Sequence, residues 1–438
     1  MYPNLYYLFK DWFGVEWKGL QFLNMFGLMV ALSFIAAAIF FTLELKRKEK
    51  QGLLLPREEV IIVGKPASFY ELLINAFIGF LFGYKLLGLF IDKADDVSAQ
   101  DYIFSKQGSM LGGLAVAVLL AALKWWDKNK QKLKEPERRN IRIWPHDRVG
   151  DIVVIALLFG VLGAKLFDAF ENWDSFIADP AGTLFSAAGL TFYGGLIVAA
   201  VAVCWYAYKK GIKLTHLTDA AAPALLIAYA IGRIGCQVAG DGDWGIYNSA
   251  YITDDNGKVI AATPEQYKQQ LQKYDYYFLH GTAFDSGMLK NNNGRTNKSL
   301  DAVPAISFKA PSFLPTWMVA YNYPGNVNKD GPITLPSNNS EHNKVLPIPV
   351  FPTPFYETVI AFILFLFLWG MRKKIKVPGV MFGVYLILNG LERFFIEKIR
   401  VNTIFIYNYT QAEIIAILII LAGIALIIYQ KAKAKQPA

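Results

Sequence analysis

The chain has 438 residues, of which 54% are hydrophobic and only 18% are charged, and its formal net charge is +9. A soluble domain contains about 45–50% apolar and about 25% charged residues. This composition excludes a disordered chain and argues against an ordinary soluble enzyme.

The apolar residues are concentrated in runs of about 20, the length that an α-helix needs to cross the hydrocarbon core of a bilayer. These runs predict an all-α polytopic membrane protein with about nine transmembrane helices. In chain order they lie at about 20–43, 68–92, 108–126, 149–170, 188–208, 217–237, 353–371, 378–396 and 411–430.

Lys and Arg residues gather in alternate loops, which predicts the sides of the membrane. The basic loops are 44–67, 127–148, 209–213, 372–377 and the tail 431–438, whereas 167–187 has no Lys or Arg. Because cytoplasmic loops carry the excess of basic residues, we predict the N-terminus outside and the C-terminus in the cytoplasm. The N-terminal segment lacks the basic start of a cleaved signal peptide. Most of the positive charge thus reflects topology, and no nucleic-acid partner is predicted.

The segment 240–350 differs in kind from the rest. It is polar, rich in Asn, Gly, Pro and Tyr, and too long for a plain connection between helices. We expect it on the outside, in the periplasm of a bacterium, as an insert or small subdomain. The predicted regions are the periplasmic segment 1–19, helices one to six in 20–239, the insert 240–350, and helices seven to nine with a cytoplasmic tail in 351–438.

The second and third apolar segments resemble the fourth and fifth. The residues at 83–86 match those at 163–166 with an offset of 80, and those at 112–114 match 194–196 with an offset of 82. A slowly drifting offset is typical of a duplicated hairpin, and its removal would leave a parent architecture of seven spans. Chance similarity between apolar segments is the alternative. The predicted copies are 68–126 and 149–208.

The first charged group inside an apolar run is Arg233, flanked by Gly232 and Gly235 near the outer end of the sixth segment. A charged side chain at membrane depth is a functional candidate. A guanidinium also offers a planar fork of donors that suits phosphate. The alternative is an interfacial arginine that extends to the head groups, followed by the turn 240–245.

A second group comprises Arg393, Glu397 and Arg400, at the end of the eighth segment. Spacings of four and seven residues place all three on one helical face. On the predicted topology they lie outside, where basic residues are disfavoured. We therefore predict an anion site, with a structural ion pair as the alternative.

A third group opens the fifth segment, where Tyr193 precedes the adjacent Gly194 and Gly195, and Lys165 lies near the outer end of the fourth. Adjacent glycines weaken a helix and indicate either a ligand or close helix packing. All three groups are predicted at the outer leaflet. Two arginines and a lysine that converge there would hold an anionic lipid head group.

Other chemistry is disfavoured by the motifs. No two of the four histidines have metal-ligand spacing, so we predict no metal, and no cofactor is required. The sequence has no G-x-S-x-G elbow and no P-loop, which argues against a lipase and a nucleotide-driven pump. The cysteines Cys204 and Cys236 form no disulfide framework.

Five motifs, in family order between about residues 20 and 430, resemble those of the prolipoprotein diacylglyceryl transferase family. They are Phe26-Gly-Leu-Met29, Thr191-Phe-Tyr-Gly-Gly-Leu196, Gly232-Arg-Ile-Gly235 with Gly240-Asp241 and Trp244-Gly245, Pro352-Thr-Pro-Phe-Tyr-Glu357, and Arg393-Phe-Phe-Ile-Glu-Lys-Ile-Arg400. Asp219 stands 14 residues before Arg233, at the spacing of the family's aspartate. The extra hairpin and the insert would be additions to a seven-span core.

The resemblance implies transfer of the diacylglyceryl group of phosphatidylglycerol to the lipobox cysteine of a prolipoprotein signal peptide, in the inner membrane of a bacterium. The thiol becomes a thioether and glycerol phosphate leaves, with membrane lipid as a further partner. The residues that it places in catalysis are Arg233, Arg393, Tyr193, Asp241 and Glu397. Those that it places in substrate binding are Arg233, Gly235, Gly194, Gly195, Lys165, Asp219, Arg400, Tyr356, Glu357 and Trp244.

The sequence departs from the family pattern at several positions. They are Tyr193 for histidine, Cys236 for asparagine, Phe26 for tyrosine, Lys165 where arginine is common, and Asp241 (or Asp243, given one inserted residue) for glutamate. Without the histidine, the motifs do not identify the group that accepts the thiol proton. The alternatives are a non-catalytic membrane binding or assembly subunit on the same fold, and a lipid transporter.

Overall fold

The computed structural model describes residues 1–88, 102, 107–185, 189–281, 299–335, 342–401, 404–406 and 409–435. Within these ranges the chain is mostly helical, and eight helices are long and apolar enough to cross a membrane. The predicted segment 378–396 is also a helix, α15 (Val380–Glu397), but it carries Glu392, Arg393 and Glu397 and is not among the eight. The prediction of an all-α polytopic membrane protein is confirmed.

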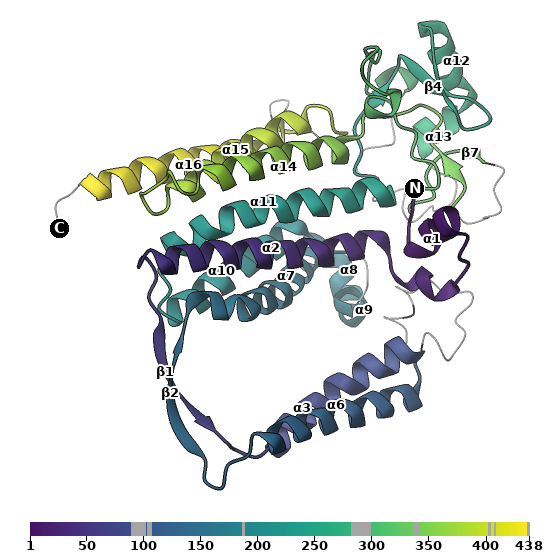
Figure 1. The fold of residues 1–438 in the computed structure, drawn as a ribbon. Coiled ribbons are helices and arrows are strands. Elements are labelled where there is room, and N and C mark those ends of the chain that lie inside the picture. Colours follow the sequence, from purple (N-terminus) through teal and green to yellow (C-terminus); the bar gives the residue numbers. More distant parts are fainter. Residues whose placement is uncertain are drawn as a thin grey trace. The chain divides into compact units, whose positions relative to one another are not determined.

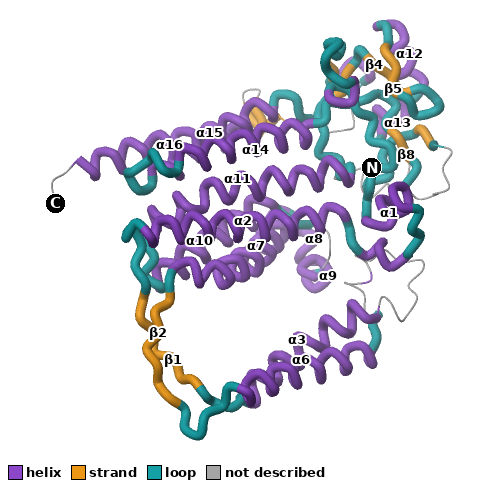
Figure 2. Tube along the Cα trace, viewed as in Figure 1, coloured by secondary structure: helices purple, strands orange, loops and turns teal. Residues whose placement is uncertain are grey.

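The chain divides into two compact units. Figures 1 and 2 show the helices and strands of both units. Unit 1 comprises Met1–Val15, Asn24–Phe41 and Thr215–Ala438. Unit 2 comprises Glu16–Leu23 and Thr42–Leu214. The long helix α2 (Met25–Lys50) contributes to both.

The membrane helices of unit 1 besides α2 are α11 (Leu214–Ala239), α14 (Thr353–Met371), α15 and α16 (Gln411–Lys435). Glycines let α15 and α16 approach closely, because a Cβ on Gly423 would lie only 2.7 Å from the carbonyl oxygen of Gly383. Buried apolar side chains join α11, α14 and α15, namely Ala222, Leu226, Ile227, Phe365, Leu368 and Met381.

The insert between α11 and α14 has an apolar core of its own, built around Trp244, Phe278, Tyr323 and Ile348. Its strands pair β4 with β5 and β7 with β8 antiparallel, and β3 with β6 parallel. The elements are β3 (Tyr247–Asn248), β4 (Tyr251–Thr253), β5 (Val259–Ala261), α12 (Pro264–Lys273), α13 (Asp275–His280), η5 (Leu300–Ala302), β6 (Ala305–Ile306), η6 (Thr316–Met318), β7 (Ile333–Thr334) and β8 (Lys344–Val345). Unit 1 also contains α1 (Leu5–Phe13) and the strand pair β9 (Ile404–Ile406) and β10 (Tyr409–Thr410).

Unit 2 contains two helical hairpins, in which α3 packs on α6 and α7 packs on α10. A seven-residue antiparallel ladder of β1 with β2, from Arg57 paired with Ile143 to Val63 paired with Glu137, precedes and follows the first hairpin. The elements are η1 (Lys18–Phe22), β1 (Arg57–Val63), α3 (Phe69–Phe82), the π-helical turn η2 (Gly83–Leu87), α6 (Met110–Lys130), β2 (Glu137–Ile143), η3 (Pro145–Arg148), α7 (Val149–Glu171), α8 (Trp173–Ala178), α9 (Pro180–Phe185) and α10 (Phe192–Lys209).

The two hairpins make equivalent close contacts. A Cβ on Gly83 would lie 2.7 Å from the Cβ of Val116, and a Cβ on Gly163 would lie 2.6 Å from the Cβ of Val198. The first residues of these contacts differ by 80 and the second by 82, which are the offsets of the sequence repeat. These contacts recur with the offsets of the sequence repeat, and the duplication stays a prediction.

The lysines of the two hairpins also have matching contacts. The ammonium of Lys85 donates to the carbonyl oxygen of Tyr102 at 3.1 Å, and that of Lys165 donates to the carbonyl oxygen of Thr183 at 3.3 Å. Each lysine therefore binds the backbone of the segment that connects the two helices of its own hairpin.

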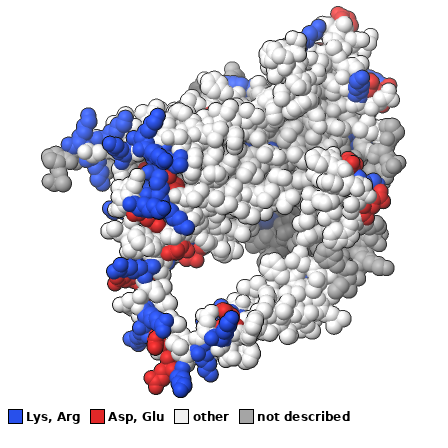
Figure 3. Space-filling view, viewed as in Figure 1, with Lys and Arg blue, Asp and Glu red and all other residues white. Residues whose placement is uncertain are grey.

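Charged side chains are unevenly distributed within each unit (Figure 3). In unit 2, Lys and Arg gather along the ladder of β1 and β2, and in unit 1 they gather near the C-terminal end of α16. These are the basic segments from which the sequence predicts the cytoplasmic side.

Candidate active site

Three helices and one loop of unit 1 bring the predicted anion-binding residues together. α11 presents Arg233 near its C-terminal end, and the chain then turns at Gly240, with φ of +67°, toward Asp243. α14 presents Glu357 near its start, and α15 presents Arg393 in its last turns. These side chains lie far apart in the sequence and meet where α11 and α15 end and α14 begins.

Glu357 lies at the centre of the site. Its side chain is 0% exposed, and its carboxylate pairs with Nε of Arg233. The same carboxylate lies 3.5 Å from Nη1 of Arg393 and 3.5 Å from Nη1 of Arg400. A buried charge is tolerated only when it is paired. Glu357 therefore holds three guanidinium groups around one carboxylate.

Asp243 bridges two of these arginines. One carboxylate oxygen accepts a hydrogen bond from Nη1 of Arg233, and the other accepts from Nη2 of Arg400 at 2.6 Å. Burial opposes ionisation of Asp243, but the charges of Arg400 and Arg233 outweigh it and lower the pKa to about 2. Arginines bind phosphate oxygens through the same fork of donors. Asp243 therefore occupies a position that would suit a phosphate.

Asp241 lies beside Cys236 at the end of α11. Burial and the charge of Asp243 raise the pKa of Asp241, whose carboxylate accepts from the backbone N–H of Asp243 at 3.2 Å. The thiol of Cys236 and the two carboxylates have ligand atoms within 4.8 Å of one another. Because both oxygens of Asp243 already accept from arginines, this arrangement favours an ion-pair network over a metal centre.

Glu397 orients Arg393 from one turn further along α15. Its side chain is buried, and its carboxylate lies 3.0 Å from Nη2 of Arg393. The hydroxyl of Thr410 donates to the same carboxylate at 2.9 Å. Arg393 thus pairs with two buried carboxylates, those of Glu357 and Glu397.

Three further residues predicted to bind substrate support the walls of the site. The ring of Trp244 lies 4.6 Å from that of Tyr323 in the core of the insert. The hydroxyl of Tyr356 donates to the carbonyl oxygen of Met318 at 2.5 Å. Gly235 faces α2, where the nearest side-chain atom would lie 3.0 Å from an added Cβ. Their contacts with substrate stay predictions.

Asp219 lies on α11 well before Arg233. Its carboxylate accepts hydrogen bonds from the backbone N–H groups of Gly379 at 2.8 Å and Phe382 at 3.0 Å. These bonds join α11 to the start of α15. The predicted role of Asp219 in substrate binding stays a prediction beside this structural contact.

The remaining predicted residues belong to unit 2. Gly195 packs against α7, because an added Cβ would lie 2.8 Å from the carbonyl oxygen of Gly160. Gly194 is buried in the same helix contact, and Tyr193 is partly buried beside it on α10. Close helix packing therefore accounts for the adjacent glycines, and the substrate roles predicted for them, for Tyr193 and for Lys165 stay predictions.

Two residues near the arginines are not identified by the motifs. The ring of Tyr229 lies 5.7 Å from the guanidinium of Arg233. Glu392 directly precedes Arg393 and is only 6% exposed. A carboxyl group inside a predicted span is itself a signal of function, so the rule that selects Arg393 would also select Glu392. A tyrosine in a span gives no such signal.

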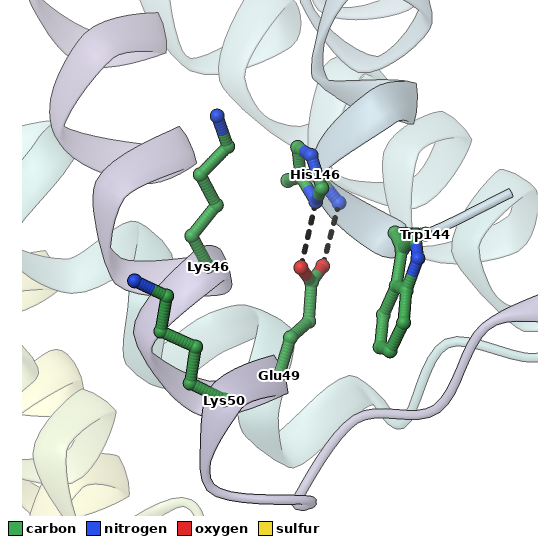
Figure 4. Close-up of a pocket in the computed structure, with 5 residues that line it drawn as sticks. All are labelled: Lys46, Glu49, Lys50, Trp144 and His146. Carbon is green, nitrogen blue, oxygen red and sulfur yellow. Dashed lines mark hydrogen bonds and ion pairs between the residues drawn. The ribbon is translucent and has the colours of Figure 1, made fainter.

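Unit 2 also has a pocket of about 280 Å³ (Figure 4). It is lined by Lys46, Glu49 and Lys50 of α2 and by Trp144 and His146, which follow β2. Nδ1 of His146 lies 2.6 Å from one carboxylate oxygen of Glu49, and the His146 backbone N–H donates to the other at 2.9 Å. The pair fastens the end of α2 to the start of α7 and contains no predicted site residue.

Comparison with known proteins agrees with the motifs. The family model for prolipoprotein diacylglyceryl transferase matches residues 110–429. The phosphatidylglycerol–prolipoprotein diacylglyceryl transferase of Leptospira interrogans is 23% identical over 318 residues, covering 67% of this chain and 70% of the relative. Proteins of the same name from Dehalococcoides mccartyi (23% over 291 residues, 66% and 80% covered) and Streptococcus agalactiae (22% over 325 residues, 74% and 89% covered) are also similar. The chain belongs to the prolipoprotein diacylglyceryl transferase family.

Proposed function

We propose that the protein transfers the diacylglyceryl group of phosphatidylglycerol to the lipobox cysteine of a prolipoprotein in the bacterial inner membrane. The observation that carries this proposal is the pairing of Arg233 and Arg400 with the single carboxylate of Asp243. Two guanidinium groups that share one anion at the end of membrane helices suit the phosphate of a lipid head group.

The reaction breaks the bond between the diacylglyceryl carbon and the phosphate oxygen, so negative charge grows on the departing glycerol phosphate. Arg233 and Arg400 are placed to bind that charge once Asp243 yields its position. Fixed positive groups in a site that excludes water lower the barrier most where charge develops. Arg393, which Glu397 orients, adds a third positive group.

The other assigned residues have supporting roles in the proposal. Glu357 keeps the three arginines together, and Asp241 and Trp244 shape the loop that carries Asp243. The roles of Lys165 and Tyr193 toward the head group or the thiol stay predictions. The lipid arrives from the bilayer, the signal peptide docks beside it, and no cofactor is needed.

The test is product formation by the full chain in lipid nanodiscs. Phosphatidylglycerol with isotope-labelled acyl chains and a lipobox peptide are supplied, and the mass of the peptide is followed. We expect a labelled thioether from the wild type and a loss of about 10²-fold or more in Arg233→Ala. Arg142→Ala, at an exposed pair 3.2 Å from Glu58, is the matched control. No thioether from the wild type would reject the proposed function.

A further inference from the structure

Glu392 is a buried carboxyl group that makes no side-chain hydrogen bond within the described part of the chain. Its side chain is 6% exposed, and among the residues that the structure describes neither carboxylate oxygen has a hydrogen-bond partner. Leaving a buried polar group unpaired costs about 1–3 kcal/mol, and more when the group is charged. A buried carboxyl group with unused hydrogen-bond acceptors is a candidate for a catalytic role.

Glu392 interacts electrostatically with the arginines of the candidate site. The charged groups that act on it are Glu357 on α14, Arg393 on α15, Arg233 on α11, and Arg400 just beyond α15. Two phenol groups, Tyr229 on α11 and Tyr385 on α15, also interact with it. The carboxyl group is thus buried within electrostatic range of charged residues from the helices that build the site.

These groups lie further from the C-terminal ends of α11 and α15 than the arginines do. Tyr229 is one helical turn before Arg233, and Tyr385 is about two turns before Glu392, with each turn rising about 5.4 Å. Both helices end at the site, so Tyr229 and Glu392 lie before those ends, and Tyr385 lies still further back along α15. Helical side chains also tilt toward the N-terminus, which directs the carboxyl of Glu392 away from the end of α15.

The transfer reaction requires a proton acceptor on this side of the arginines, further from the helix ends. A nucleophile attacks a saturated carbon from the side opposite the leaving oxygen. If the arginines hold the phosphate at the helix ends, the glyceryl carbon lies further in and the sulfur lies beyond it. The attacking species is the thiolate, so a proton must be removed from the thiol on that inner side.

We propose that Glu392 accepts the proton of the substrate cysteine. This inference rests on the proposed function and supplies the acceptor that the motifs leave unassigned. The thiol proton passes to the Glu392 carboxylate, a carbon–sulfur bond forms, and the carbon–oxygen bond to phosphate breaks. Its electron pair leaves with glycerol phosphate, which takes up the proton when it departs. Charge and atoms balance without a further reactant.

The test compares wild type with Glu392→Gln, using one lipobox peptide made with cysteine and one with selenocysteine. A selenol loses its proton more readily than a thiol and needs less help from a base. We expect kcat of the variant with the cysteine peptide to fall by about 10²-fold or more, with KM for phosphatidylglycerol changed less than about threefold. With the selenocysteine peptide the variant should regain activity to within about tenfold of the wild type.

The control is Glu413→Gln, which changes another buried glutamate of unit 1, paired with Lys398 at 2.5 Å, and should alter both activities less than twofold. Full activity of Glu392→Gln with cysteine would overturn the assignment, and so would an equal loss with both peptides, which marks a structural role. An inactive wild type would instead remove the proposed function and this role together.

Discussion

The guanidinium of Arg233 pairs with the carboxylate of Glu357, whose side chain has no exposed surface at all. Each member of such a pair depends on the other, because either one alone would be a charge buried without compensation. Two more arginines lie against the same carboxylate. The site therefore behaves as one electrostatic unit.

Replacing Glu357 by Gln keeps the shape of the side chain and removes the charge that holds three guanidinium groups. Breaking a buried ion pair costs about 3–5 kcal/mol, so we expect the free energy of unfolding to fall by about 3 kcal/mol and transfer activity to be lost. Thermal unfolding in detergent and the peptide assay measure the two effects. Glu58→Gln removes an exposed pair and should cost less than about 1 kcal/mol; equal costs would contradict the central role of Glu357.

Replacing Arg233 by Lys keeps the charge but removes the fork that reaches Glu357 through Nε and Asp243 through Nη1. A single ammonium cannot make both contacts in this geometry. We expect kcat to fall by about 10²-fold. Arg139→Lys, at a surface pair 2.7 Å from Glu137, should leave kcat unchanged. Wild-type turnover by the Arg233 variant would show that charge alone is sufficient.

Replacing Asp243 by Asn removes the negative charge that competes with an anion for Arg233 and Arg400. We expect glycerol phosphate to inhibit the variant at concentrations about tenfold lower than the wild type, because one repulsive charge is gone from its site. The inhibition constant at neutral pH measures this. Asp255→Asn, at an exposed pair with Lys273 in the insert, is the control. An unchanged constant would mean that the product binds elsewhere.

The lowered pKa of Asp243 also makes the stability of the folded protein depend on pH. Its pKa in the folded protein is about 2, below the ordinary value of 3.8. The ionised group therefore stabilises the fold fully above about pH 4, and this stabilisation is lost as the pH falls from about 4 through about 2. Unfolding temperatures of the wild type and Asp243→Asn should differ near neutral pH and converge in this acid range. A difference in unfolding temperature that stays constant with pH would show that the substitution acts through packing and not through the charge of Asp243.

The two hairpins of unit 2 allow a test of the duplication. Gly163→Ala places a Cβ 2.6 Å from Val198, which should destabilise the protein by about 1–3 kcal/mol. Gly160→Ala on the same helix has its nearest neighbour at 3.9 Å and should be neutral or slightly stabilising. Gly83→Ala should behave like Gly163→Ala, and its thermal unfolding checks this. Tolerance at Gly83 would show that the first hairpin packs differently.

Much of the membrane fold can be predicted from the sequence because long apolar runs have few alternatives in a bilayer. The predicted runs and the helices agree to within a few residues at most ends. The ladder of β1 and β2 is not predicted, because it forms between two basic loops far apart in the chain. The short strands of the insert likewise depend on contacts that no local pattern specifies.

The candidate site likewise contains residues that can be predicted from the sequence and residues that cannot. Arg233 and Arg393 are found from the sequence, because charge inside an apolar run is costly and therefore noticeable. The central position of Glu357 is not, because it depends on how α14 meets α11 and α15. The choice between Asp241 and Asp243 is also open in the motif. The geometry shows that Asp243 contacts the arginines, while Asp241 lies behind it.

The pairing of β1 with β2 brings together the two ends of the segment that contains the first hairpin of unit 2, so this segment could be deleted and the chain rejoined. Val60 and Asn140 are partners in the ladder, so the chain leaves for this hairpin and returns at the same place. Paired residues lie about 5 Å apart, a gap that a two-residue Asn-Gly turn closes. Excising 61–139 would keep Glu59, which binds Arg148 at 2.6 Å. The shortened chain would have the seven spans expected of the core without the extra hairpin, and its turnover can be compared with that of the full protein.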